Sequence, residues 1–256
     1  MENMTQQGRV ETSIENGVGI IEFFHPKSNS LPAKLLLNLT KAIKEFGKSE
    51  DVKVIVLRSA GDGAFCAGAS FDELLAIKDF VSAQNFFLGF AHVILAIRQV
   101  PKFVIARVQG KAVGGGMGIA CAADYTMATD KASVKLSELS VGFGPFVIGP
   151  AVERRIGISA FQTLSINASE WHHAAWAKEK GVYSEIFPDS NALDEAVSKL
   201  AVQLAISNPE AMKEMKNMFW QNVPEWDKLL EERAAISGRL ALSDFAIQTI
   251  QKFKQG

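Results

Sequence analysis

A run of three glycines at residues 114–116 is the feature that most constrains how this chain can fold and act. It lies within VIARVQGKAVGGGMGIACAA, residues 104–123, where a β-branched run precedes the glycines and small apolar residues follow them. This pattern predicts a strand, a turn without Cβ atoms and then a helix, whose first backbone N–H groups have no partner within the helix. Such a turn either presents an N–H to a polarised oxygen, as an oxyanion hole does, or allows the helix to pack closely.

Two nucleotide-binding motifs are excluded at this turn. A phosphate loop requires Lys and then Ser or Thr after its last glycine, whereas Gly116 is followed by Met117 and Gly118. A dinucleotide-binding turn needs a third glycine at the position of Cys121. The glycines therefore do not predict a nucleotide cofactor held in either of these ways.

Strands and helices alternate on both sides of the turn. Residues 10–24 contain two β-rich runs joined by Asn16-Gly17, which predicts a hairpin. The β-branched strand at 52–57 is followed by a small-residue loop at 59–70, and ligands gather at such strand ends in open α/β sheets. The other predicted elements are helices at about 33–46, from Phe71, at 82–100, 159–164, 169–178, 193–206, 209–220, 226–237 and 243–254, and strands at 103–108, 125–129 and 133–135.

This order predicts an α/β fold with a helical C-terminal region. We place the α/β core at residues 1–190 and the helical region at 191–256, which we expect to pack on a neighbouring core and not to fold by itself. The 256 residues are 48% hydrophobic, which suffices for a full core without a metal or a disulfide. Cys66 and Cys121 lie among small apolar residues, so we expect buried free thiols and no metal site.

Charge and hydropathy exclude several classes of partner. A net charge of −1 and the lack of a Lys/Arg block interleaved with aromatics argue against nucleic acid. The polar segment Met1–Gln7 lacks the basic start and apolar run of a signal peptide, and no uninterrupted apolar run approaches about 18 residues. The sequence therefore predicts a soluble, cytoplasmic protein without a membrane partner.

Three segments resemble the signature segments of the crotonase, or enoyl-CoA hydratase/isomerase, family. They are FCAGAS at 65–70, QGKAVGGGMG at 109–118 and SELSVGFGP at 137–145, in the order and spacing of that family. The resemblance implies a crotonase-like fold of repeated β-β-α units with a C-terminal helical region. It also implies an acyl-CoA thioester as partner, with coenzyme A as part of the substrate and no other cofactor, and assembly as a homotrimer or a dimer of trimers.

The resemblance assigns an oxyanion hole to the backbone N–H groups of Ala69 and Gly115. In the family these two groups hold the thioester oxygen, and here both lie on small-residue turns that follow predicted parallel strands. Ala67, Gly68 and Gly114 belong to the same two turns and are expected to line the substrate site.

One of the family's two hydratase glutamates is missing. Gly118 stands at the position of the first, where we expect it to border the substrate, and Glu138 corresponds to the second. A glutamate after a strand is usually solvated, but the apolar neighbours of Glu138 predict a partly apolar pocket and a raised pKa suited to a base. Some relatives carry a catalytic acid at the position that Phe146 occupies here, so the resemblance offers no further carboxylate at that position.

Weaker matches concern the coenzyme A moiety. Lys27, Ser28 and Ser30 match a family segment near pantetheine and adenine, and Phe71 matches an apolar residue beside the adenine. The tail lysines Lys252 and Lys254 lie near positions where relatives contact CoA phosphates, although a solvated lysine is the alternative at each position. His172 and His173, expected on a helix, diverge too far to share a metal ion, so we expect a solvated or capping role.

Three functions remain open at this point. With one carboxylate, the simplest chemistry is double-bond isomerisation of an enoyl-CoA, in which Glu138 moves a proton between two carbons. Hydration of a 2-enoyl-CoA is the alternative if Glu138 alone activates a water. The third possibility is an acyl-CoA-binding protein without catalytic activity, which the retained Glu138 disfavours.

Overall fold

The computed structural model describes residues 8–221, 223 and 225–255. The segment Met1–Gln7 and the side chain of Lys254, both of which carried sequence-based expectations, lie outside the described residues.

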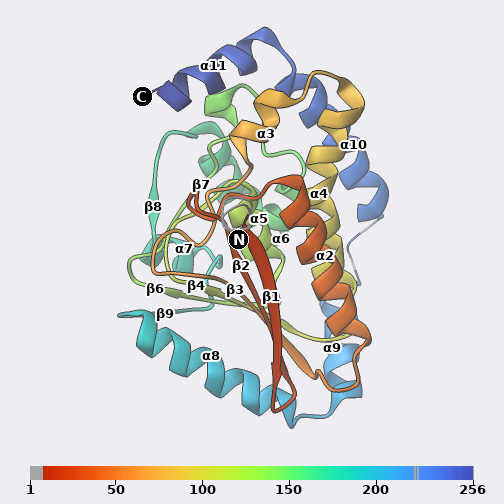
Figure 1. Cartoon of the computed structure of the whole chain (residues 1–256). Coiled ribbons are helices and arrows are strands. Elements are labelled where there is room, and N and C mark those ends of the chain that lie inside the picture. The colour runs from red at the N-terminus through yellow and green to blue at the C-terminus, as the bar shows by residue number, and fades with distance from the viewer. Residues whose placement is uncertain (1–7, 222, 224, 256) are drawn as a thin grey trace.

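Within these residues, six strands form the large sheet at the centre of the molecule (Figure 1). Their order is β1-β2-β3-β4-β6-β9, in which β1 and β2 are antiparallel and all other neighbours are parallel. The predicted hairpin is confirmed, and both turn residues have positive φ, 51° at Asn16 and 82° at Gly17. The strands are β1 (Arg9–Glu15), β2 (Val18–Phe24), β3 (Val54–Ser59), β4 (Val104–Val108), β6 (Tyr125–Thr129) and β9 (Glu185–Phe187).

A smaller sheet lies beyond the carboxyl ends of the central strands. It consists of β5 (Ala112–Val113), β7 (Ser133–Lys135) and β8 (His172–His173), in the order β5-β7-β8. The chain thus passes from β4 through β5 into helix α5 (Gly115–Ala122), and from β6 through β7 to the short 3-10 helix η1 (Leu139–Val141) and α6 (Gly149–Ile166). This alternation is the repeated β-β-α unit that the sequence predicted, and it brings the ends of β5 and β7 side by side.

Helices cover both faces of the large sheet. On one face, α2 (Ala33–Lys48), α4 (Phe80–Gln99) and α10 (Trp226–Ala241) pack side by side and form the larger core with α5 (Figure 1). On the other face, α8 (Ser190–Ala205) lies across β3, β4 and β6, where Leu193 and Val197 contribute to a second core. The remaining helices are α3 (Phe71–Ala76), α7 (Ala174–Glu179), α9 (Pro209–Trp220) and α11 (Asp244–Gln255).

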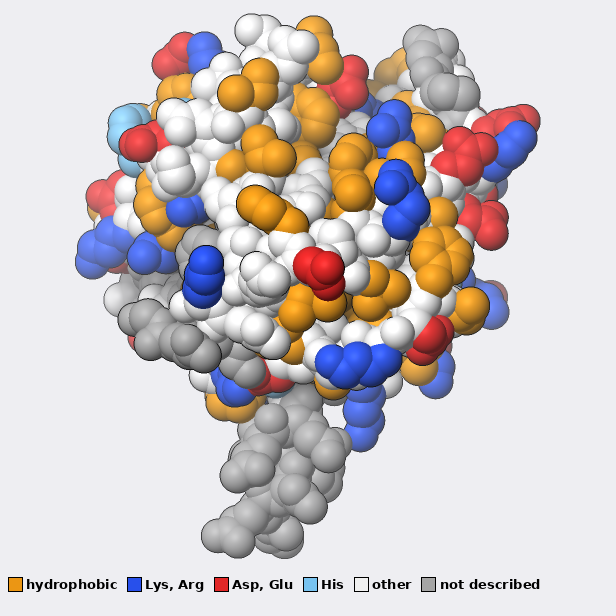
Figure 2. Space-filling view, turned by 90° about the horizontal axis from the view of Figure 1, so that it is seen from above, with side chains coloured by type: hydrophobic (Ala, Val, Ile, Leu, Met, Phe, Trp, Pro, Cys, Tyr) orange, Lys and Arg blue, Asp and Glu red, His pale blue; other side chains and the backbone are white. Residues whose placement is uncertain are grey.

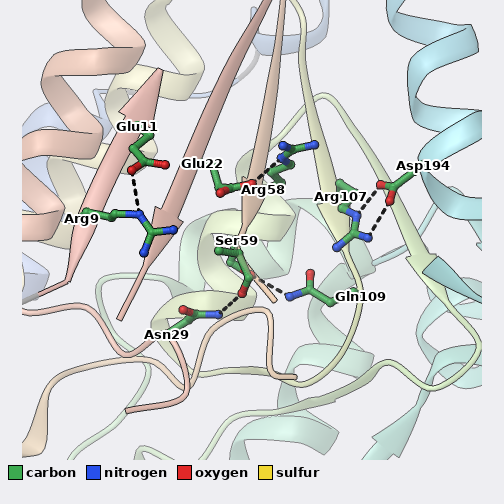
Figure 3. A network of polar contacts seen from close by, with 10 residues as sticks. Arg9, Glu11, Glu22, Asn29, Arg58, Ser59, Arg107, Gln109 and Asp194 are labelled. Atoms are coloured by element: carbon green, nitrogen blue, oxygen red, sulfur yellow. Dashed lines mark hydrogen bonds and ion pairs between the residues drawn. The ribbon is translucent and has the colours of Figure 1, made fainter. Parts of the chain in front are cut away.

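The helical region is tied to the sheet by polar contacts as well. Arg107 on β4 is 6% exposed, and its guanidinium donates two hydrogen bonds to the Asp194 carboxylate on α8, at 2.8 and 3.0 Å (Figure 3). A pair of parallel bonds of this kind fixes geometry as well as charge. This ion pair therefore fixes helix α8 against strand β4.

Two sequence-based assignments are wrong. His172 and His173 form strand β8, which pairs antiparallel with β7, and not part of a helix. His173 nevertheless has the expected capping role, because its Nδ1 accepts a hydrogen bond from the Trp176 N–H at 3.2 Å and so caps α7. Helix α6 begins ten residues earlier than predicted. Gly157, with φ at 75°, divides it into two halves, and the sequence pattern predicted only the second half.

Helix α4 is by length and composition the one described helix that could cross a membrane, with a mean hydropathy of 1.7 over its most apolar window. In this fold it lies between α2 and α10, and more than half of that window is buried. Its apolar character is thus explained by its central position in the core.

Candidate active site

The loop that follows β3 is anchored by two buried amide side chains (Figure 3). Asn29, which has φ at 55°, donates from Nδ2 to the carbonyl oxygens of Ala60 and Ala64 at 3.2 and 2.9 Å. Gln109 donates from Nε2 to Ser59 Oγ at 2.9 Å. Because both anchors come from other segments of the chain, the start of this loop is held in one position relative to β4 and to residues 25–31.

The end of the same loop lies against the glycine turn. Val113 donates its N–H to the Cys66 carbonyl at 2.9 Å, and Cβ of a side chain at Gly68 would lie 3.0 Å from the Val113 carbonyl oxygen and 3.6 Å from the Gly115 nitrogen. Gly68 also has φ at 87°, which favours glycine. The two turns with small residues therefore meet backbone to backbone.

The N–H groups of Ala69 and Gly115 are free at this junction. Leu31 donates to the Gly68 carbonyl at 2.8 Å, and because alternate backbone groups face opposite sides in a parallel pairing, the N–H of Ala69 is directed away from Leu31. Gly115 is the first residue of α5 and so has no acceptor within that helix. The structure records no hydrogen-bond acceptor for either N–H among the described residues.

Each glycine of the turn lies against a different neighbour. Cβ of a side chain at Gly114, where φ is 50°, would lie 2.7 Å from Glu138 Oε1, and at Gly115 it would lie 2.1 Å from the Phe90 ring. At Gly116 it would lie 2.5 Å from Cys66 Cβ. Close packing and an exposed N–H are therefore both features of this turn, because the packing holds the backbone at the edge of the site.

Glu138 follows β7 and directs its carboxyl group at the glycine turn. Its Oε2 is buried and has no hydrogen-bond partner within the part of the chain that the structure describes. Burial away from water disfavours the charged form and raises the pKa of Glu138 from 4.5 to about 7. The carboxyl group can therefore exchange a proton near neutral pH, which is the property of a general acid or base.

A cavity that is partly open to solvent joins these groups. Apart from Glu138 and two serines, its walls are backbone and apolar side chains, so an acyl chain rather than a charged group fits between them. The lining residues are Ala67, Gly68, Ala69, Phe71, Phe87, Phe90, Gly114, Gly115, Ser137, Glu138, Val141, Phe143, Gly144, Pro145, Phe146, Val147, Ile148 and Ser237.

Two free backbone N–H groups beside a buried carboxyl group match what the signature segments imply. The sequence model of the enoyl-CoA hydratase/isomerase family matches residues 13–251. The chain belongs to the enoyl-CoA hydratase/isomerase family. Membership of this family implies an acyl-CoA thioester as substrate, and the fold is that of the crotonases.

Individual relatives agree with this assignment. The mitochondrial enoyl-CoA hydratase of Pongo abelii is 32% identical over 221 residues, which are 84% of this chain and 74% of that protein. The peroxisomal bifunctional enzyme of Homo sapiens is 27% identical over 222 residues, which are 86% of this chain and 29% of that protein. The crystal structure of enoyl-CoA hydratase from Bacillus halodurans superposes with a TM-score of 0.87 at 22% identity, covering 95% of this chain and 99% of that one.

Most residues expected to bind coenzyme A lie together at the mouth of the cavity. Lys27, Ser30 and Phe71 line an adjoining groove, which shares Ala67, Ala69 and Phe71 with the cavity. The Lys27 ammonium contacts the Asp72 carboxylate, and Ser30 Oγ lies 3.0 Å from His25 Nδ1. In this family member the groove therefore adjoins the cavity at the turn that carries the Ala69 N–H.

Ser28 and Gly118 were also expected at the substrate site, but they line neither the cavity nor the adjoining groove. Ser28 lines a separate depression, and its carbonyl accepts the Ala67 N–H at 3.1 Å, so its contact with the site is through the backbone. Gly118 is not among the cavity-lining residues, contrary to the sequence-based expectation. Cβ of a side chain at Gly118 would lie 2.5 Å from Cβ and Cγ2 of Ile148, so Ile148 covers this position and lines the cavity in its place.

Sequence reasoning missed the side chains that shape the walls. Phe90 on α4 and Ser237 on α10 reach the cavity from helices far from the signature segments in the sequence, and Ile148 reaches it from the residue just before α6. The helical periodicity of α4 and α10 predicts which of their residues are buried, but it gives no sign that Phe90 and Ser237 border a ligand site. Asn29 could have been suspected, because asparagine tolerates the positive φ that it adopts here.

Proposed function

We propose that this protein isomerises the double bond of an enoyl-CoA, with Glu138 as the only carboxylate that transfers protons. The observation that carries the proposal is the pairing of one buried carboxyl group, whose Oε2 has no partner among the described residues, with an apolar side chain, Ile148, which lies over Gly118, the position of the first family glutamate. A single base can serve both ends of an allylic shift, whereas addition of water needs a place where water is held.

The steps follow from the geometry of the described groups. The N–H groups of Ala69 and Gly115 bind the thioester oxygen and stabilise the negative charge that develops when a proton leaves the adjacent carbon. Glu138, ionised at a pH above about 7, takes that proton and returns it at the γ carbon, which moves the double bond into conjugation with the thioester. The apolar walls exclude water from the enolate between the two transfers.

One assay separates isomerisation from hydration. A 3-enoyl-CoA and a 2-enoyl-CoA with the same acyl chain are each incubated with the protein, and the isomerised and hydrated products are quantified. We expect the 3-enoyl substrate to be converted to the 2-enoyl product faster than water is added to either. Rapid hydration of the 2-enoyl substrate would favour the hydratase alternative, and the absence of α-proton exchange in deuterated water would favour a binding protein.

We also propose that the chain assembles as a trimer or a dimer of trimers, as its family resemblance implies. Hydrophobic side chains gather on the face seen in Figure 2. Phe80, Val81, Leu139 and Phe245, at the start of α4, in η1 and in α11, are between 44% and 68% exposed. Exposed apolar residues that cluster in this way are typical of an interaction surface. Light scattering on the purified protein should give three or six times the chain mass of 27.8 kDa, and a monomer at micromolar concentration would contradict the proposal.

A further inference from the structure

The cavity contains a polar side chain that the isomerase mechanism does not use. Ser237 on α10 lines the cavity and is 1% exposed. Its hydroxyl group has no hydrogen-bond partner among the residues that the structure describes, whereas other helical serines, such as Ser165, bond to the carbonyl one turn earlier. Ser237 Oγ is not among the fully enclosed polar atoms that lack a partner, so it is accessible from the cavity, where a ligand can supply the missing bond.

Contacts along α4 show where this hydroxyl group lies relative to the reacting end of the site. Phe90 packs on the oxyanion glycine Gly115, and Cβ of a side chain at Gly238 would lie 2.8 Å from the backbone nitrogen of Gln84. Gln84 and Phe90 are six residues apart on this helix, which corresponds to about 9 Å along its axis. Ser237, next to Gly238, therefore lies at the end of the cavity away from the oxyanion hole.

The surroundings of Ser237 limit the chemistry of what it can bind. Phe87 and Phe143, which stack edge to face at 5.4 Å, line the same cavity, and no Lys, Arg or His is among its described lining residues. A carboxylate at the end of an acyl chain would find no counter-charge here, and it would share the cavity with Glu138. A neutral hydroxyl or carbonyl oxygen satisfies Ser237 without this cost.

We propose that Ser237 hydrogen-bonds a neutral oxygen on the distal part of the acyl chain, so that the preferred substrate is an acyl-CoA carrying a hydroxyl or carbonyl group away from the thioester. This inference rests on the proposed function, because it places an acyl-CoA in the cavity. The hydrogen bond selects the substrate and takes no part in the proton transfer.

The test compares two 3-enoyl-CoA substrates of equal chain length, one with a terminal hydroxyl group and one without. We expect wild type to prefer the hydroxylated substrate in kcat/KM by about tenfold or more, because a site built to bond a hydroxyl group rejects an analogue that lacks it. Ser237→Ala should remove most of that preference by lowering kcat/KM for the hydroxylated substrate alone. Ser165→Ala, which removes a helix serine outside the cavity, should change neither value.

A binding measurement keeps this proposal separate from the isomerase proposal. Dissociation constants of the matched saturated acyl-CoAs, with and without the hydroxyl group, need no turnover and should show the same preference in wild type and its loss in Ser237→Ala. Ser237→Cys, which keeps a side chain of similar size with only a weak donor, covers the case in which the alanine variant does not fold. Equal affinity of wild type for the two compounds, or an equal loss for both in the variants, would overturn the assignment of Ser237.

Discussion

Glu138 shows how one residue can carry both reactivity and a stability cost. Its carboxyl group lies over the Gly114 backbone, and its Oε2 has no partner among the described residues, so the protonated form is favoured in the folded protein. The resulting pKa of about 7 lies well above the 4.5 of an ordinary glutamate, and it suits a base that must both take up and release a proton near neutral pH.

We expect Glu138→Gln to lower turnover by a factor on the order of 100 to 10,000, because a general base is removed, while coenzyme A binding is kept. The kcat/KM of wild type should rise with pH through about 7, as the carboxyl group ionises, and should then level. A pH profile of both proteins checks this, and unchanged turnover in the variant would remove Glu138 from the mechanism.

The same residue should make stability depend on pH. Because its pKa is raised in the folded state from 4.5 to about 7, the folded protein binds more protons than the unfolded chain between these values, and stability falls as pH rises through this window. Urea denaturation at several pH values should show wild type losing stability relative to Glu138→Gln between about pH 4.5 and 7. A difference that does not vary with pH would contradict the buried state of this carboxyl group.

The loop after β3 and the turn before α5 act together because other elements hold each of them. Asn29 anchors the loop with its amide group, and its Oδ1 also accepts the His25 N–H at 2.9 Å. The loop that carries the Ala69 N–H of the proposed oxyanion hole is thus anchored by a residue that does not line the cavity.

We expect Asn29→Ala to cost about 1–3 kcal/mol or more of stability and to lower kcat/KM, because buried backbone groups lose their partners and alanine resists the φ of 55°. Asn29→Gly is the matched control, since glycine accepts this backbone conformation but also lacks the amide. Chemical denaturation and kinetics of both variants separate the two causes. If both variants match wild type, the anchor has no role in positioning the loop.

At the start of α6, Ile148 decides what can stand at position 118. We expect Gly118→Glu alone to cost roughly 1–3 kcal/mol, because its Cβ would meet Ile148 at 2.5 Å and the helices would have to move. Combining it with Ile148→Gly should relieve this clash and raise the ratio of hydrated to isomerised product, since a second carboxyl group could then reach the cavity. Ile148→Gly alone is the control, and equal hydration by it and the double variant would show that added space, not the carboxylate, admits water.

At the scale of the whole molecule, a buried ion pair joins the helical region to the sheet. Lys216 on α9 is 2% exposed, and its ammonium group donates to Asp124 Oδ2 at 2.8 Å and to the carbonyl oxygens of Ile97 and Lys102 at 2.7 and 2.8 Å. Burial lowers the pKa of Lys216, which the charge of Asp124 opposes. The end of α4, the start of β4 and α9 thus meet at one cation.

We expect Lys216→Met to lower the free energy of unfolding by about 3–5 kcal/mol, because it leaves the Asp124 carboxylate buried without its partner. Lys213→Met, on the same helix, removes only an exposed pair with Glu210 at 3.3 Å and should change stability by less than about 1 kcal/mol. Urea titrations of the two variants provide the comparison. A cost for Lys216→Met no larger than that of the control would contradict a structural role of the pair.

The sequence by itself determined the features that rest on local chemistry. Asn16-Gly17 specified the hairpin, the glycines specified the turn before α5, and the order of strands and helices specified an α/β fold, because turn torsions and hydrophobic periodicity are properties of neighbouring residues. The signature segments also predicted an oxyanion hole at Ala69 and Gly115 and a base at Glu138, and the structure adds how deeply that carboxyl group is buried.

Only the tertiary structure decided what fills the space between these segments. Ile148 lies over Gly118 although thirty residues separate them, Ser237 reaches the cavity from α10, and β7 draws His172 and His173 into a strand that their local sequence does not favour. Contacts of this kind depend on which surfaces the fold brings together, and the period of a helix or strand does not encode them. Tertiary packing therefore places Ile148 and Ser237, the residues on which the proposed reaction and substrate preference depend, at the site, and the local sequence pattern does not reveal them.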